Sequence, residues 1–201
     1  MDGPMSLKAS KMKQLELDLE YINNLITLIY KIRYSSKLKP FMAPHNKIVV
    51  AGGAIRDMLF NKPVDDIDVF YEGEINESIF KSYFPNATTS DTTYPDGWNV
   101  THNIMCDSFP VKVQLIQVEN IEKHLKTFPS PMMRLYVDGH GVHGVDCTVI
   151  QDAMSQVFFW DKAPDLNYFL KIKAKYSDWK HEFMEKHFNP EEQLEAFDLE
   201  F

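Results

Sequence analysis

A strand, two glycines, a short helix and an acidic strand follow one another within residues 47–71, and this succession constrains the fold more than any other part of the sequence. Residues 47–51 are rich in β-branched side chains and predict a strand, which Gly52-Gly53 ends. Residues 54–60 predict a helix that stops near Pro63, and the alternation of acidic and apolar residues over 65–71 predicts a second strand.

The residues within this succession suit the binding of a phosphate and a metal ion. Gly52 and Gly53 allow the backbone to approach an anion closely, and the start of the following helix offers unpaired N–H groups. Asp66 and Asp68 are two positions apart on a strand, so both carboxylates face the same side. Two carboxylates beside a phosphate site favour Mg²⁺, and two-metal phosphoryl transfer then needs only an in-line acceptor hydroxyl. Asp65 is expected to be a solvated acid.

The remaining patterns predict an α+β (α/β-like) fold, in which a small mixed β-sheet is flanked by N- and C-terminal helices. Three-part organisation is expected: an N-terminal amphipathic helix over 1–39 packed on the core or forming a homodimer surface, a core over 40–160, and a C-terminal helix with an acidic tail over 161–201. Further helices are predicted over 11–36, 75–84, 119–128 and 166–187. Further strands are predicted over 98–105, 111–118, 133–137 and 142–145.

Composition places the chain among ordinary globular proteins. The 201 residues are 44% hydrophobic and 25% charged, which is typical of a packed domain. Two cysteines are too few for a disulfide framework, and no signal peptide or membrane-length apolar run is present, so a cytoplasmic protein without a membrane partner is expected. The net charge of −8 excludes a protein that grips nucleic acid by bulk charge, so any such contact must be local.

The order Gly52-Gly53, Arg56-Asp57 and Asp66-x-Asp68 resembles the head-domain signature of the DNA polymerase β-like nucleotidyltransferase superfamily, particularly its tRNA CCA-adding and poly(A) polymerase branch. Looser likeness to short bacteriophage-encoded nucleotidyltransferases continues to about residue 176, which would place the protein in the host cytoplasm. The resemblance implies that the glycines cradle an NTP, that Asp66 and Asp68 hold Mg²⁺, and that Arg56 and Asp57 brace the phosphate loop and helix. It also implies transfer of an NMP to a hydroxyl acceptor with release of pyrophosphate, the acceptor being an RNA 3′ end, tRNA included, a small molecule or a protein side chain.

Two departures from this pattern leave alternatives open. The superfamily places a third carboxylate on a later strand, where this chain has Gln114, and Asp146 could substitute from another strand. A neutral amide predicts a requirement for high Mg²⁺ or a preference for Mn²⁺. The long helical body with which CCA-adding enzymes hold tRNA has no counterpart among the residues after Trp160. A catalytically weak nucleotide- or protein-binding module on the same fold, and an interaction protein acting through its N-terminal helix, are therefore the alternatives.

Three further groups of residues have both a functional and a simpler structural interpretation. Lys171 and Lys175 share a helix face and could contact a triphosphate or a nucleic-acid backbone, although a solvated helix face is the simpler interpretation. The segment from Asp138 through His140 and His143 to Cys147 could suggest zinc, but its glycines favour a polar hairpin. Cys106 and Cys147 are expected to be small core residues.

Overall fold

The computed structural model describes residues 47–78, 81, 85–93, 99–104, 111–138, 141–184 and 190. The chain forms two compact units, one comprising Met1–Thr127 with Met133–Gly144 and the other comprising Phe128–Met132 with Val145–Phe201. The predicted helix over 11–36, the acidic tail, Cys106 and His140 lie outside the described residues, and so does most of the predicted helix over 75–84. None of the helices in the described ranges has the length and apolar character needed to cross a membrane.

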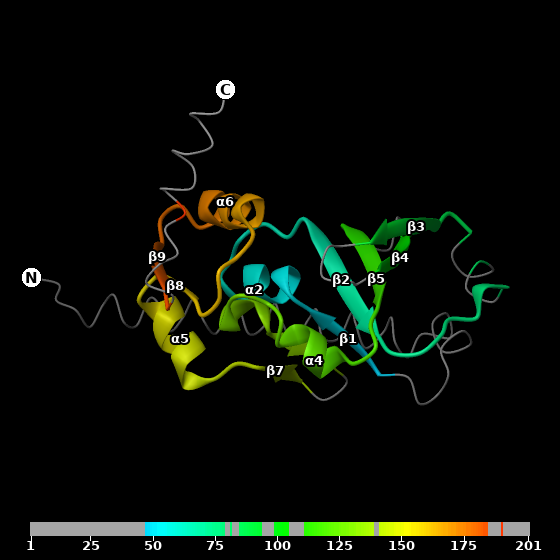
Figure 1. Ribbon diagram of the computed structural model, residues 1–201, viewed down its shortest axis with the longest axis horizontal. Helices are drawn as coiled ribbons and strands as arrows, with labels where there is room; N and C mark the ends of the chain where they lie inside the picture. The colour runs from blue at the N-terminus through cyan, green and yellow to red at the C-terminus, as the bar shows by residue number, and fades with distance from the viewer. Residues whose placement is uncertain are drawn as a thin grey trace, which may run out of the picture. The chain divides into compact units, whose positions relative to one another are not determined.

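The first unit is built on a seven-stranded mixed sheet with the strand order β3-β4-β5-β2-β1-β6-β7 (Figure 1). Its strands are β1 (Ile48–Ala51), β2 (Asp66–Tyr71), β3 (Thr88–Thr93), β4 (Asn99–Ile104), β5 (Lys112–Gln117), β6 (Tyr136–Val137) and β7 (Val142–His143). The β2–β5 pair is parallel, and the other five pairs are antiparallel. This arrangement confirms the predicted mixed sheet and places β2 between β1 and β5.

Two short helices and the central strands supply the apolar interior of the first unit. Helix α2 (Gly53–Leu59) follows β1 directly, and α4 (Ile121–Leu125) follows β5, where the side chain of Asn120 accepts a hydrogen bond from the Lys123 N–H at 2.8 Å. Buried apolar side chains come from β1, α2, β2, β5 and α4; they include Val49, Val50, Ala51, Ala54, Ile55, Met58, Ile67, Phe70, Tyr71, Val113, Leu115, Ile116, Ile121 and Leu125. The core of the first unit therefore includes the strand–helix–strand succession of residues 47–71.

The second unit contains α5 (Cys147–Met154), β8 (Val157–Trp160), α6 (Leu166–Lys175) and β9 (Lys180–Phe183). Strands β8 and β9 run parallel, with Trp160 opposite Phe183. Rings from both strands and from α6 pack together: the Trp160 ring centroid lies 5.6 Å from that of Phe169 in an edge-to-face contact and 6.1 Å from that of Phe183 in a stacked one. An aromatic cluster thus forms the core of this unit.

The second unit corrects three predictions. The predicted helix over 166–187 is wrong beyond Lys175, because the chain turns at Tyr176 and then pairs with β8. Cys147 is exposed at the start of α5, so its assignment to the core is wrong. Asp146 does not lie on a strand, since it is the N-cap residue of α5.

Candidate active site

The Gly52-Gly53 turn connects β1 to α2 in a conformation that requires glycine. Gly52 has φ 81° and ψ −138°, a region that side chains disfavour strongly. Its N–H donates to the Leu135 carbonyl at 3.1 Å, while its own carbonyl accepts from the Arg56 N–H at 3.3 Å. The turn is thereby fixed between the segment before β6 and the first turn of α2.

Arg56 and Asp57 form a buried ion pair behind this turn. The Arg56 Nε donates to Asp57 Oδ1 at 2.7 Å, and Nη2 of the same guanidinium lies 2.6 Å from that oxygen. The two side chains are only 3% and 4% exposed. A Cβ added to Gly53 would lie 3.4 Å from Arg56 Nη2, so the guanidinium packs against the turn. These side chains can support the turn, but burial keeps them from contacting a ligand in solvent.

Asp66 and Asp68 occupy the same face of β2, because successive strand side chains alternate and the intervening Ile67 is buried. Asp68 lies in register with Ala51, the residue before the Gly52-Gly53 turn, on one side. It lies in register with Gln114 of β5 on the other side. The sheet therefore brings the turn, the two carboxylates and Gln114 together across three adjacent strands.

The third position of the site is an amide pair instead of a carboxylate. Gln114 Nε2 donates to Asn103 Oδ1 at 3.0 Å, and Asn103 is the register partner of Gln114 on β4. The amide nitrogen of Gln114 is engaged by Asn103, and its carbonyl oxygen is the kind of ligand atom that suits a hard cation. Within the described ranges, no group of three His, Cys, Asp or Glu residues gathers as a metal cluster. Two carboxylates and an amide oxygen nevertheless fit Mg²⁺ or Mn²⁺.

Lys112 is a charged neighbour of the candidate carboxylates that the sequence alone does not single out. It lies in register with Asp66, and its Nζ is 3.9 Å from Asp66 Oδ2. Both side chains are partly exposed, at 39% and 34%. The local sequence does not indicate that Lys112 and Asp66 are close, because their proximity depends on the parallel pairing of β2 with β5.

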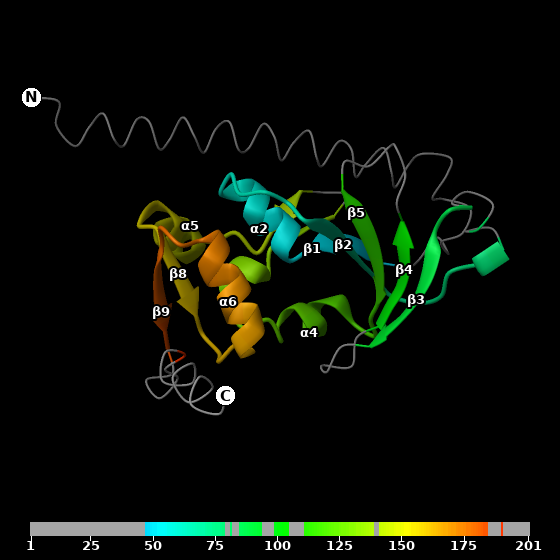
Figure 2. The same cartoon turned by 90° about the horizontal axis from the view of Figure 1, so that it is seen from above.

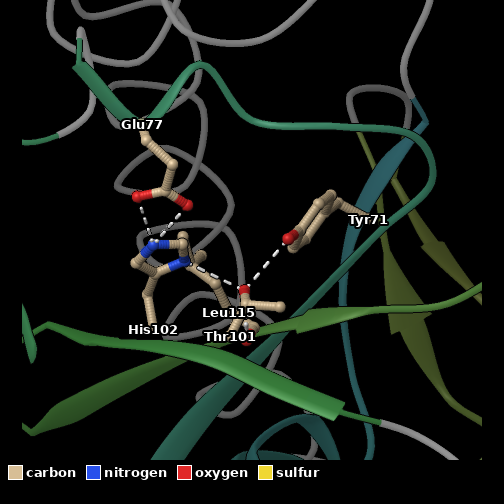
Figure 3. Close-up of polar contacts among 5 residues, drawn as sticks. All are labelled: Tyr71, Glu77, Thr101, His102 and Leu115. Atoms are coloured by element: carbon tan, nitrogen blue, oxygen red, sulfur yellow. Dashed lines mark hydrogen bonds and ion pairs between the residues drawn. The ribbon is translucent and has the colours of Figure 1, made fainter. Parts of the chain in front are cut away.

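A hydrogen-bonded network on the opposite face of the sheet holds β4 in place (Figure 3). The pairing of β4 with β5 shifts between Val100 and His102, so that Thr101 forms a bulge. His102 is buried, with Nε2 3.0 Å from a Glu77 carboxylate oxygen and Nδ1 3.0 Å from the Thr101 hydroxyl oxygen. That hydroxyl also lies 2.9 Å from the Tyr71 hydroxyl, whose pKa is raised mainly by burial. The network fixes the bulge directly before Asn103.

The other predicted site residues are not brought to these carboxylates within the first unit. Lys171 and Lys175 lie on α6 in the second unit. Asp146, also in that unit, accepts hydrogen bonds from the Thr148 hydroxyl and from the Val149 N–H, and these lower its pKa. Its carboxylate therefore already caps a helix. In the first unit, His143 Nε2 lies 2.9 Å from Asp138 Oδ1.

The fold of the chain is similar to that of solved CCA-adding enzymes. A solved CCA-adding enzyme in complex with CTP matches 94% of this chain with a TM-score of 0.57 and 16% sequence identity. An apo form of a CCA-adding enzyme matches 90% with a TM-score of 0.54 and 16% identity. The chain spans 47% and 44% of those two enzymes. No protein-family model and no curated protein sequence matches the chain.

Proposed function

We propose that the protein is a divalent-metal-dependent nucleotidyltransferase that moves an NMP from an NTP to a hydroxyl acceptor. The observation that carries this proposal is the register across β1, β2 and β5, which aligns the Gly52-Gly53 turn, Asp68 and Gln114 on a nucleotidyltransferase head fold. The two solved neighbours are CCA-adding enzymes, one of them bound to CTP, and this supports CTP as the first nucleotide to test.

Each residue of the site has a role in the proposed reaction. The backbone of the Gly52-Gly53 turn receives the triphosphate, and the buried Arg56–Asp57 pair keeps the turn in position. Asp66 and Asp68 hold Mg²⁺ or Mn²⁺ together with the Gln114 carbonyl. The cation supplies charge neutralisation of the phosphates and polarisation of the acceptor hydroxyl. Lys171 and Lys175, which lie on α6, stay predicted phosphate contacts.

The proposed reaction is an in-line displacement. The acceptor oxygen forms a bond to the α-phosphorus while the bond from that phosphorus to the α,β-bridging oxygen breaks. Pyrophosphate leaves with the bonding electrons, and the acceptor proton passes to water. Catalysis of this kind depends chiefly on positioning and on neutralisation of charge, so a dedicated general base is not required.

An RNA 3′ end, including that of tRNA, is the acceptor we propose. The acidic composition of the chain predicts a small and local contact with RNA. Binding to RNA should consequently show a shallow dependence on salt, corresponding to about two to four phosphates.

The test is transfer of label from α-³²P-NTPs into total RNA and into total protein. The wild-type chain should label RNA, and Asp68→Asn should abolish labelling without unfolding the protein. Asp65→Asn is the matched control, because Asp65 is exposed beside the same strand and the chemical change is identical. Equal labelling by wild type and Asp68→Asn would refute the proposed function.

The alternative is a catalytically weak nucleotide-binding module on this fold. The amide pair of Gln114 and Asn103, which stands where the superfamily has a carboxylate, favours this alternative. It predicts that NTP with Mg²⁺ raises the melting temperature while no acceptor becomes labelled. Activity that appears in Gln114→Glu but not in the wild type would also support it.

A further inference from the structure

Lys112 is a positive charge built into the carboxylate face of the proposed site. It begins β5 in register with Asp66, and residues in register on adjacent strands project from the same face of a sheet. The Lys112 Nζ to Asp66 Oδ2 distance of 3.9 Å agrees with this placement. Both side chains are partly exposed, so a cation or a ligand can reach them from solvent.

We propose that Lys112 is the resident counter-ion of Asp66, which a divalent cation must displace, and that the displaced ammonium then binds a phosphate group of the substrate. This inference rests on the proposed function. It explains how a site with two carboxylates remains stable before metal binds: Lys112 offsets part of the repulsion between Asp66 and Asp68.

Lys112 carries a positive charge beside one of the two carboxylates of the proposed site. A divalent cation that approaches Asp66 meets the Lys112 ammonium, which lies 3.9 Å from Asp66 Oδ2. Lys112 should thus weaken the binding of metal alone and favour binding of metal together with phosphates.

The place of Lys112 in the sheet limits which phosphate it can meet. The Gly52-Gly53 turn extends from β1, on one side of β2, and Lys112 lies on β5, on the other side. Adjacent strands are about 4.8 Å apart, so roughly 10 Å separates β1 from β5. A phosphate next to Lys112 belongs either to the far end of the NTP triphosphate or to an acceptor that carries its own phosphate. Both present the same phosphate oxygens.

Binding of Mn²⁺ alone to the full chain, measured from free Mn²⁺ by electron paramagnetic resonance, tests the first half of the inference. Lys112→Gln should lower the dissociation constant roughly three- to tenfold, and Lys112→Glu should lower it further. Lys112→Arg should bind as the wild type does. Lys123→Gln on α4 is the matched control, because it removes the same charge from an exposed position beyond the other end of β2.

The outcomes separate this inference from the proposed function. If Asp66→Asn and Asp68→Asn do not weaken Mn²⁺ binding, the metal site itself is absent and both proposals fall. If those variants weaken binding but Lys112→Gln behaves like Lys123→Gln, the role of Lys112 is refuted and the proposed site survives. A graded series from Arg through Gln to Glu supports the counter-ion role.

Binding of phosphate is tested at saturating Mn²⁺ with two probes, CTP and a short single-stranded RNA with a free 3′ hydroxyl. Lys112→Gln should weaken one of them about three- to tenfold, while Lys112→Arg restores the affinity. Loss with CTP assigns the contact to the triphosphate, and loss with RNA assigns it to the acceptor. Unchanged affinity for both probes would overturn the phosphate role.

Discussion

Removal of the charge from Asp57 should destabilise the first unit by about 3 kcal/mol. Asp57 and Arg56 are 4% and 3% exposed, and a guanidinium nitrogen lies 2.6 Å from the carboxylate. Breaking a buried ion pair by changing one partner costs roughly 3–5 kcal/mol, and Asp57→Asn belongs at the lower end because its amide oxygen still accepts a hydrogen bond. For a chain of about 200 residues, this corresponds to a melting temperature lower by about 6–12 °C.

Urea unfolding followed by circular dichroism measures this loss, and two further variants show its origin. Asp65→Asn makes the same chemical change at an exposed position and should alter the free energy of unfolding by less than about 0.5 kcal/mol. The double variant Arg56→Met, Asp57→Leu should be less destabilised than the sum of its single changes, because no charge is then left buried. A cost below about 1 kcal/mol for Asp57→Asn would refute the buried-pair reasoning.

The same variant should affect nucleotide binding, since the Arg56 guanidinium packs 3.4 Å from the position of a Cβ on Gly53. A loosened guanidinium leaves the turn less firmly held. We therefore expect weaker NTP binding by Asp57→Asn at temperatures where the variant remains folded. Unchanged NTP affinity in the folded variant would show that the pair stabilises the unit without organising the turn.

Three other predictions concern the two units separately. Burial lowers the pKa of His181, whose Nδ1 accepts a hydrogen bond from Trp160 Nε1 at 3.1 Å. The contribution of the neutral ring to the free energy of unfolding should therefore be fully present above about pH 6.5 and be lost as the pH drops through the lowered pKa. Tryptophan fluorescence measures this, and His181→Phe should flatten the dependence. Gln114→Glu should lower the Mn²⁺ dissociation constant about tenfold in an electron paramagnetic resonance titration, and an unchanged constant would place this residue outside the metal site. Gly144→Ala should cost about 1–3 kcal/mol in urea unfolding, because its φ is +80° and a Cβ would lie 2.9 Å from the Arg134 carbonyl oxygen; an unchanged midpoint would contradict this.

The sequence was sufficient to predict the elements whose signals are local. The two strands and the helix between residues 47 and 71 follow from β-branched residues, a glycine pair and strict alternation. Val113 and Leu115 alternate with Gln114 along β5, and both are buried. Lys112 and Asn103 could not be found in this way, because their proximity to Asp66 and Gln114 depends on pairing between strands that are distant in sequence.

The elements that were missed lack a local signal or depend on a distant partner. Strand β3 consists of Thr, Ser and Asp residues without apolar alternation, and it lies at the edge of the sheet beside β4, as Figure 2 shows. Strand β9 follows α6 closely and was predicted as its continuation. Its conformation is stabilised instead by pairing with β8, which places His181 and Phe183 against the Trp160 ring. Helix propensity is readily overridden by such tertiary packing.

The parallel pairing of β2 with β5 has a consequence for mutations far from any ligand. No tight turn can set the register of a parallel pair, so the matched apolar residues Ile67 with Val113 and Phe70 with Ile116 must align the two strands. A slip of one residue would place Val113 or Leu115 beside Asp68, where neither could ligate a cation. Polar substitutions at Ile116, which is fully buried, should therefore weaken metal binding at the proposed site by disturbing this register.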